Sequence, residues 1–258
     1  MFITLTTDFG ASDHFVGAMK GAILSIAPRA VLVDITHQIE PYNVNEAAFV
    51  VAQAWRYFPK RTIHVIVVDP GVGSARRPIL AQSGGHFFIA PDNGVLSMVY
   101  DSGPHQVRVI SNPKLMRKIV SRTFHGRDVF APAAAHLARG TPPAKFGGII
   151  RDYVRSSLKP RQLSASAWAG TILKVDRFGN LITNLHIDNF PEARTRPLEL
   201  RVGVERIHRF ALTFSDAAIG ELFVIVGSSG YLEIAANQAP AARLTGCGPG
   251  APVELRLL

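Results

Sequence analysis

The sequence predicts an α/β N-terminal domain, with a mostly parallel central sheet flanked by helices, followed by an all-β C-terminal barrel. In the first half of the chain, short apolar runs alternate with amphipathic helical patterns, which is typical of a parallel sheet covered by helices. Residues 140–170 are rich in Pro, Gly and Ser, and beyond them short apolar runs follow one another without a helical pattern. The expected domains are therefore residues 1–160 and 161–258.

Strands are predicted wherever β-branched and apolar residues cluster between turn signals. In the first domain these runs are Phe2–Thr6, Ala30–Asp34 and Thr62–Val68. In the second domain they are Thr171–Val175, Leu198–Val202, Leu222–Val226, Tyr231–Ala235 and Val253–Leu257. Because the later runs are short and have no helix between them, we expect a small antiparallel barrel or sandwich.

Three helices are predicted in the first domain. The first follows Asp13 and ends before Pro28, with apolar residues spaced along one helical face. The second opens at Asn43, which is followed three residues later by a glutamate as in a capping box, and ends near Tyr57. The third runs from about Asp128 to Arg139 and is closed by a glycine and a proline.

Composition indicates a globular protein of the reducing cytoplasm. Hydrophobic residues make up 47% of the 258 residues, and the single cysteine, Cys247, provides neither a disulfide nor a thiolate metal site. The N-terminus has no basic, apolar leader pattern, and no apolar run of about 18 residues occurs, so neither export nor a membrane span is expected. The net charge is +9, but the densest basic stretch, residues 114–122, lacks interleaved aromatics. We therefore expect a solvated basic face and no nucleic-acid partner.

Polar residues gather where predicted strands end, which is where open parallel sheets bind ligands. Asp69 and Arg76 follow one strand, and His125 precedes the third helix. Together they offer a carboxylate, a permanent cation and a group that titrates near neutrality. An ordinary Pro-Gly turn, a surface arginine and a loop histidine are the alternatives. The third glycine of a dinucleotide fingerprint is replaced by Arg76, and no Gly-Lys-Ser/Thr occurs, so neither a nicotinamide nor a Walker A site is expected.

Several long motifs in order resemble the S-adenosylmethionine hydroxide adenosyltransferases, the relatives of bacterial fluorinases and chlorinases. The resemblance spans nearly the whole chain. The motifs are TTDFG at 6–10, DITHQIEPYNVNEAA at 34–48, YFP at 57–59, VVDPGVGSARR at 67–77, PDNG at 91–94, TFHGRDVFAP at 123–132, DRFGNLITN at 176–184 and SSGYLEIAAN at 228–237.

This resemblance implies an enzyme that cleaves S-adenosylmethionine with water at the ribose 5′ carbon, giving adenosine and methionine. It also implies a homotrimer in which each nucleoside lies between the N-terminal domain of one subunit and the C-terminal domain of the next. Substitution at C5′ expels a neutral thioether, so neither a cofactor nor a metal is expected.

In the N-terminal domain, the resemblance implies roles for five residues around the substrate. Asp8 matches the carboxylate that accepts both ribose hydroxyls, although an Asx turn is the alternative. Asp13 is expected to support Asp8 or to cap the helix, and Tyr42 matches an aromatic placed against the ligand. Phe124 and Gly126 flank His125 and are expected to border the substrate.

In the C-terminal domain, Asp176 resembles the acceptor for the methionine ammonium, Phe178 a packing surface and Asn180 an adenine-edge contact. The alternative for residues 176–180 is a plain hairpin turn. The remaining expected binding residues are Ser229 near the methionine carboxylate, Glu233 as a further local acid, and Asn237 with Ala239 at the adenine rim. The run Ala-Asn-Gln-Ala-Pro at 236–240 departs from the Asn-Gly-Ser-Ala and Arg-Asn-Ala patterns of the family.

The nucleophile pocket separates hydrolysis from halide substitution. In the halogenases a tyrosine matches Asp69 and a serine matches Gly126, whereas Asp69, Arg76 and His125 resemble the set found in the hydrolases. Water, with a pKa of about 15.7, needs a base or a charge that favours hydroxide. Asp69 or His125 is expected to accept the proton, and Arg76 to stabilise hydroxide and keep Asp69 ionised. Halide-dependent substitution and a non-catalytic sensor of adenosine or S-adenosylmethionine are the alternatives.

Overall fold

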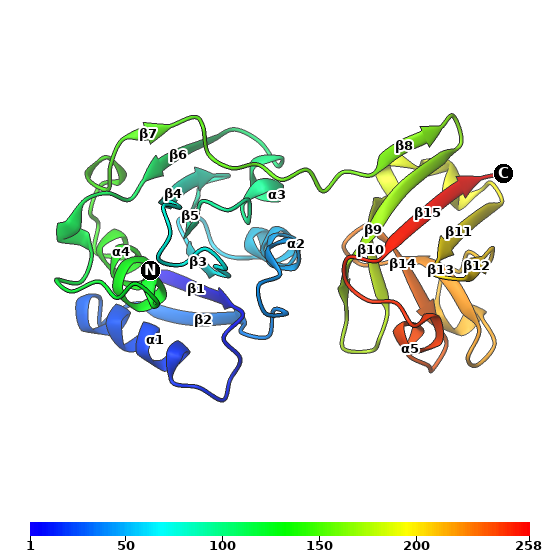
Figure 1. The fold of residues 1–258 in the computed structure, drawn as a ribbon, viewed down its shortest axis with the longest axis horizontal. Coiled ribbons are helices and arrows are strands. Elements are labelled where there is room, and N and C mark those ends of the chain that lie inside the picture. The colour runs from blue at the N-terminus through cyan, green and yellow to red at the C-terminus, as the bar shows by residue number, and fades with distance from the viewer. The chain divides into compact units, whose positions relative to one another are not determined.

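The computed structural model describes residues 1–258, and the chain divides into two compact units, Met1–Ser157 and Leu158–Leu258 (Figure 1). Residues 151–160 contain no helix or strand and carry the boundary between the units. The sequence places the division a few residues further on, between residues 160 and 161.

The N-terminal unit is built on a seven-stranded sheet in the order β2-β1-β3-β5-β4-β6-β7. Its strands are β1 (Phe2–Thr7), β2 (Val31–Thr36), β3 (Ile63–Val67), β4 (Pro78–Ser83), β5 (His86–Pro91), β6 (His105–Val109) and β7 (Ile149–Ile150). The first four strands of that order pair in parallel, and the pairings from β5 through β4 and β6 to β7 are antiparallel. The predicted α/β class is correct, but the sheet is mixed rather than mostly parallel.

The tight turn between β4 and β5 explains this difference. Gly84 and Gly85 are the only residues between the two strands, and both have positive φ angles, 55° and 84°. Such a short connection can join only antiparallel neighbours, whereas parallel strands need a longer crossover. Gly84 also lies against Trp55, because a Cβ there would be 2.6 Å from the indole ring.

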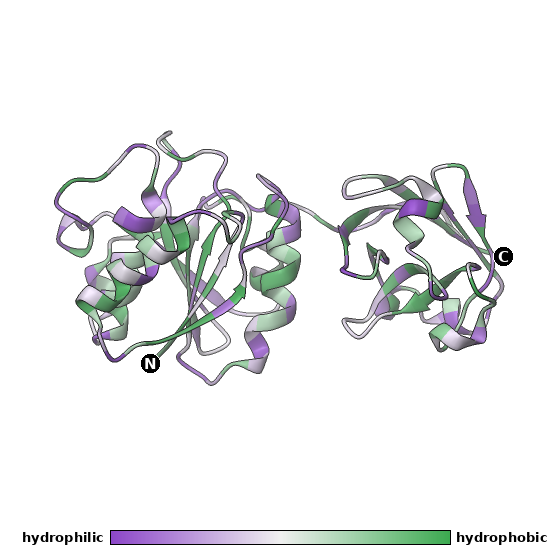
Figure 2. Ribbon diagram, turned by 90° about the horizontal axis from the view of Figure 1, so that it is seen from below, coloured by the Kyte–Doolittle hydropathy of each residue, from purple (hydrophilic) through white to green (hydrophobic).

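Helices cover both faces of this sheet. They are α1 (Phe15–Ile26), α2 (Val44–Ala54), α3 (Ser97–Tyr100) and α4 (Ala131–Ala138), the last preceded by a π-helical turn at Gly126–Phe130. Along β3, Val65 and Val67 belong to the core shared with α1 and α4, whereas Ile66 packs with α2 and α3. Figure 2 shows hydrophobic residues along the central strands of this unit and on the helices beside them. No helix of the chain is both long and apolar enough to span a membrane.

The three predicted helices are present, with local differences at their ends. The Asn43 side chain caps α2 by accepting from the Glu46 amide at 3.0 Å, and the Glu46 carboxylate accepts from the Glu40 amide. A short 3₁₀ turn at Trp55–Tyr57 continues α2 to the predicted end. The third helical segment begins at Gly126 rather than near Asp128, because a π-helical turn over residues 126–130 precedes α4.

The C-terminal unit is a nearly closed antiparallel barrel, as predicted. Its sheet runs in the order β12-β11-β15-β9-β10-β14-β13, with β8 paired to β9. The strands are β8 (Arg161–Ser164), β9 (Ala167–Val175), β10 (Leu181–His186), β11 (Leu198–Val202), β12 (Glu205–Ile207), β13 (Leu222–Val226), β14 (Tyr231–Ala236) and β15 (Pro252–Leu257). All five predicted strands occur, whereas β8, β10, β12 and the short helix α5 (Ala241–Thr245) are additional.

Candidate functional site

Two parallel strands bring the first acidic residues of the site together. β1 and β3 are neighbours, and Thr7 pairs with Val67 at their carboxyl ends. Asp8 and Asp69 follow these ends, so both lie at one edge of the sheet. A cavity of about 330 Å³ opens there, lined by Asp8, Phe9, Phe15, Pro41, Tyr42, Val67, Asp69, Val72, Thr123, Phe124, His125 and Gly126.

Arg76 joins Asp69 and His125 into one hydrogen-bonded group. Its Nε donates to Asp69 Oδ1 at 3.0 Å, and its Nη2 donates to Asp69 Oδ2. The same Nη2 lies 2.8 Å from His125 Nδ1. The Arg76 and Asp69 side chains are only 9% and 5% exposed, and the guanidinium also lies over the Phe130 ring. A bidentate ion pair this buried fixes both partners in position.

The arginine determines the protonation state of the histidine. A guanidinium has no acceptor, so His125 Nδ1 must accept from Arg76 and the ring proton resides on Nε2. Burial, and then the Arg76 charge, lower the pKa of His125 below its ordinary value. His125 is therefore neutral at pH 7 and offers an Nε2–H donor.

Arg76 lies behind the cavity wall. Asp69 and His125 line the cavity, but Arg76 does not. Nη2 is shared between these two partners, whereas Nη1 is buried and has no hydrogen-bond partner. The arginine is placed to orient the two residues that face the cavity, and its role in stabilising hydroxide stays a prediction.

Asp8 is held by the backbone of the loop that carries Tyr42. Its Oδ2 accepts from the Tyr42 amide at 2.9 Å, and Tyr42 adopts a left-handed φ of 68°. Burial raises the pKa of Asp8 above its ordinary value, and the nearby charge of Asp69 adds to this effect. The Tyr42 side chain is 73% exposed and borders the cavity. Asp13 is exposed and not part of the lining, and α1 has no side-chain cap.

Two glycines set how closely the loops of the cavity approach each other. Gly73 has a φ of 77°, and a Cβ there would be 2.3 Å from the Arg122 carbonyl oxygen. This contact packs the loop after Asp69 against the segment that leads to His125. At Gly126 a Cβ would be 3.1 Å from Met19 Sδ and 3.3 Å from the Phe124 ring. A serine at that position requires its neighbours to shift.

In the C-terminal unit, Asp176 forms the turn between β9 and β10. Its Oδ1 accepts from the amides of Phe178 and Asn180 at 2.8 and 2.9 Å, and its Oδ2 accepts from the Asn180 side chain at 2.9 Å. Asn180 is buried, whereas Phe178 is 79% exposed at the tip of the turn. The turn alternative considered from the sequence is therefore present, and it uses much of the acceptor capacity of Asp176.

The other predicted residues of this unit lie on or after β14. Glu233 is 9% exposed, and burial raises its pKa to about 7. Asn237 donates from its side chain to the Ala217 carbonyl at 2.8 Å, so part of its amide is occupied. Ser229 and Ala239 are half-buried.

Sequence reasoning missed several residues that line the cavity. Two of these are Phe9 and Phe15, which pack against each other and against the predicted Phe124, with ring centroids 5.2–6.0 Å apart. Pro41, Val72 and Thr123 also contribute to the lining. Phe9 and Thr123 belong to the motifs already singled out, so their place beside Asp8 and His125 was the available signal.

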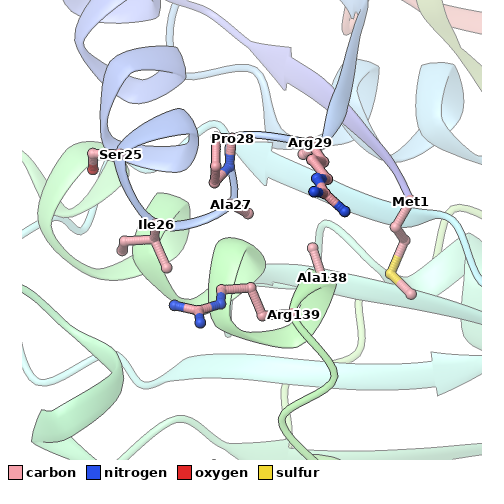
Figure 3. A pocket seen from close by; sticks show the side chains of 9 residues that line it. Met1, Ser25, Ile26, Ala27, Pro28, Arg29, Ala138 and Arg139 are labelled. Atoms are coloured by element: carbon pink, nitrogen blue, oxygen red, sulfur yellow. The ribbon is translucent and has the colours of Figure 1, made fainter.

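A second, larger cavity of about 610 Å³ lies at the opposite end of β1 (Figure 3). It is bordered by Met1, by residues 25–30, which include the end of α1, and by Ala138 and Arg139 at the end of α4. None of the sequence-predicted site residues borders it. The predicted residues Asp69 and His125 border the smaller cavity instead.

Comparison with known proteins identifies the family. Models of the SAM hydroxide adenosyltransferase N-terminal and C-terminal domains match residues 3–147 and 170–254. The chain therefore belongs to the SAM hydroxide adenosyltransferase family.

Individual relatives within this family carry two kinds of name. The chain is 38% identical to the (R)-S-adenosyl-L-methionine hydrolase of Salinispora arenicola, covering 96% of this chain and 95% of that protein. It is 31% identical to a fluorinase of an Actinoplanes species, with 93% and 92% covered. The crystal structure of an uncharacterized conserved protein from Thermotoga maritima matches with a TM-score of 0.90 at 37% identity, covering 99% of this chain and 100% of that one.

Proposed function

We propose that this protein hydrolyses S-adenosyl-L-methionine to adenosine and L-methionine by attack of water on the ribose C5′. The observation that carries this proposal is the cavity wall formed by Asp69 and His125 with Arg76 behind them. Relatives at 33–38% identity over nearly the full chain are named (R)-S-adenosyl-L-methionine hydrolase, which supports the same reaction.

The protonation states suggest how water is held and activated. His125 Nε2–H donates to the water oxygen, and an Asp69 oxygen accepts one of the water protons. As the oxygen attacks C5′, the C5′–S bond breaks and its electron pair stays on sulfur as the neutral thioether of methionine. The water proton passes to Asp69. Arg76 holds Asp69 through two hydrogen bonds and leaves the Nδ1 of His125 free of a proton, so it acts as a positioning residue.

Charge explains why the arginine is paired. The substrate carries a positive sulfonium, which an isolated guanidinium would repel. With both Asp69 oxygens bound to Arg76, the pair has no net charge next to the reacting centre. In the same proposal Asp8, whose Oδ2 is fixed by the Tyr42 amide, accepts from the ribose hydroxyls. Phe124 and Gly126 border the nucleoside, and Asp13 stays a predicted supporting residue.

The second unit supplies the remaining contacts. Phe178 offers an exposed ring for packing, Asn180 and Asn237 with Ala239 border adenine, and Asp176 and Ser229 receive the amino-acid end. The family resemblance supports a homotrimer with sites at subunit interfaces, which light scattering coupled to size-exclusion chromatography tests. A thioether leaves without a general acid, so the reaction needs no cofactor or metal. Location in the cytoplasm and the absence of a nucleic-acid partner stay predictions.

Isotope labelling tests the reaction directly. The protein is incubated with S-adenosyl-L-methionine of each sulfonium configuration in ¹⁸O-water, with and without chloride. We expect ¹⁸O in the 5′-hydroxyl of adenosine and an equal amount of methionine. A 5′-halogenated nucleoside as the main product would establish halide substitution instead, a reaction that Asp69 at the wall disfavours. Tight binding of adenosine without methionine release would establish a sensor.

A further inference from the structure

Asp128 is a buried carboxylate that follows His125 closely in the chain and lies behind the cavity wall. Its side chain is fully buried, and it belongs to the π-helical turn Gly126–Phe130. A π-helical turn inside or before an α-helix is often found at functional sites. Asp128 does not border the cavity, so it can act on the reaction only through residues that do.

The Asp128 carboxylate joins the chain on both sides of His125. Before the histidine, the Ser121 amide donates to Asp128 Oδ2 at 2.8 Å. After it, Arg127 donates to both oxygens, from Nε to Oδ1 at 2.7 Å and from Nη2 to Oδ2 at 2.8 Å. The backbone adds a third link, because the Asp128 amide donates to the Phe124 carbonyl at 3.2 Å. His125 therefore lies in a segment that Asp128 closes at both ends.

Two arginines extend this network. The Arg127 guanidinium lies over the Phe124 ring, 5.0 Å from the ring centroid, and Phe124 borders the cavity together with His125. The Arg117 amide donates to the Asp128 carbonyl at 2.9 Å, and Arg117 Nε lies 3.6 Å from Asp128 Oδ1. A carboxylate this buried needs such charge partners and hydrogen bonds. The network therefore connects Asp128 to the cavity wall without exposing it.

Asp128 is ionised at neutral pH. Burial alone would raise the pKa of Asp128, but hydrogen bonds from the Arg127 side chain and the Ser121 amide, together with the charges of Arg127 and Arg117, hold it below its ordinary value. The carboxylate therefore acts only as an acceptor. An amide in its place would direct an NH₂ group at one of the donors, so that at least one link of the segment would be lost.

We propose that Asp128 is a positioning residue of the hydrolysis, which fixes the backbone on both sides of His125 so that Nδ1 stays against Arg76 and Nε2–H faces the water. This inference rests on the proposed function. It extends the site beyond the residues that border the cavity, because Asp128 touches neither water nor substrate. The alternative is an acid that only stabilises the start of a helix.

Kinetics of Asp128→Asn separate these two roles when Asp92→Asn is the matched control. Asp92 is a second buried aspartate of this unit, and it likewise accepts from a backbone amide, that of Val154, and from an arginine side chain, that of Arg77. We expect both variants to lower the midpoint of denaturant unfolding. Only Asp128→Asn should lower kcat, by about 10- to 100-fold, because a misplacement of about 1 Å can cost that much. Calorimetric titration with adenosine counts the folded sites and should give the wild-type stoichiometry for both.

Nitrogen NMR of the histidine rings reports the state of His125 without depending on turnover. In the wild type at neutral pH we expect Nδ1 without a proton and Nε2 with one, because Nδ1 accepts from Arg76. The His125 signals are assigned by their loss in His125→Gln. In Asp128→Asn we expect a mixture of the two neutral tautomers, because the ring is no longer held against the arginine. Asp92→Asn should keep the wild-type tautomer.

Arg127→Gln keeps the inference testable if Asp128→Asn does not fold. The Arg127 side chain is one-third exposed, and its replacement removes two hydrogen bonds to Asp128 without removing the carboxylate. We expect a smaller loss of kcat and a smaller change in the His125 tautomer, both in the same direction.

Two results would overturn the inference. One is a wild-type kcat or an unchanged His125 tautomer in the folded variants of Asp128 and Arg127. The other is an equal loss of kcat in Asp92→Asn, which would assign Asp128 a structural role alone. If the wild type gives no ¹⁸O-labelled adenosine while the tautomer responds as expected, the proposed reaction is wrong and the placement of His125 by Asp128 is not.

Discussion

The two units differ in whether the side chains of their predicted sites already have partners within the fold. In the N-terminal unit, Asp69, Arg76 and His125 already form a connected group, and each charge has its partner within the same unit. In the C-terminal unit, Asp176 accepts hydrogen bonds within a turn, whereas the Phe178 ring at the tip of that turn is exposed. In the proposed reaction, the groups that perform the chemistry are thus positioned in advance by the fold. The exposed Phe178 is instead a group that we expect to gain its partner from the ligand.

Replacing the proposed base, Asp69, is the strongest test of the chemistry assigned to the N-terminal unit. Asp69→Asn keeps the shape but cannot accept the water proton, and it leaves Arg76 without its charge partner. We expect methionine release to fall by about 10²–10⁴-fold, the range for losing a general base, while adenosine still binds. The rate is measured by chromatography. Asp101→Asn, which breaks an exposed ion pair with Arg155, serves as the control. Turnover at the wild-type rate in Asp69→Asn would remove Asp69 from the mechanism.

The pH profile tests the role of the neutral histidine. The pKa of His125 is lowered by burial and by Arg76, so the neutral form persists below pH 6.5 and is lost as the pH falls through that lowered pKa. A protonated Nδ1 cannot accept from Arg76. We expect kcat/KM to be flat around neutrality and then to fall about tenfold per pH unit on the acid side. His208→Gln, at an exposed histidine, should leave that profile unchanged. A profile whose acid side lies above pH 7 would contradict the assigned tautomer.

Gly73→Ala tests how rigidly the first unit is pre-assembled. The φ of 77° and the 2.3 Å approach of a Cβ to the Arg122 carbonyl both oppose a side chain. We expect a loss of about 1–3 kcal/mol in the free energy of unfolding, the cost of such backbone strain, together with reduced hydrolysis. Denaturant unfolding measures the change in the free energy of unfolding. In the matched control, Gly21→Ala in α1, nothing lies within 4 Å of the Cβ. That change should stabilise by about 0.5–1 kcal/mol.

Phe178→Ala tests whether the C-terminal unit presents an exposed ring to the ligand. Of these changes, we expect it to have the smallest effect on stability. The ring is 79% exposed, so its loss should change the free energy of unfolding by less than about 0.5 kcal/mol. If the Phe178 ring packs against the ligand and not against the protein, KM should rise while the midpoint of thermal unfolding stays constant. A drop in the midpoint with unchanged KM would assign Phe178 a structural role instead.

The sequence was most informative where one residue pattern determines one structure. The apolar runs at 2–6 and 62–68 have the composition of buried strands, and β1 and β3 occupy them. The antiparallel half of the sheet was not predicted, because the glycine turn between β4 and β5 was not used as a hairpin signal. In the site, motifs identified Asp69, Arg76 and His125. Which of them faces the cavity depends on side-chain directions that spacing does not specify.

The contact between Gly73 and Arg122 also bears on the order of folding. It joins the two ends of the long excursion from residue 74 to residue 121, which contains β4, β5, α3 and β6. Closing a loop of that length costs chain entropy that only contacts within the excursion repay. We therefore expect Asp69 and His125 to meet only after the strands of this excursion have paired. A nascent chain that ends before residue 121 contains Asp69 and Arg76 but has no assembled site.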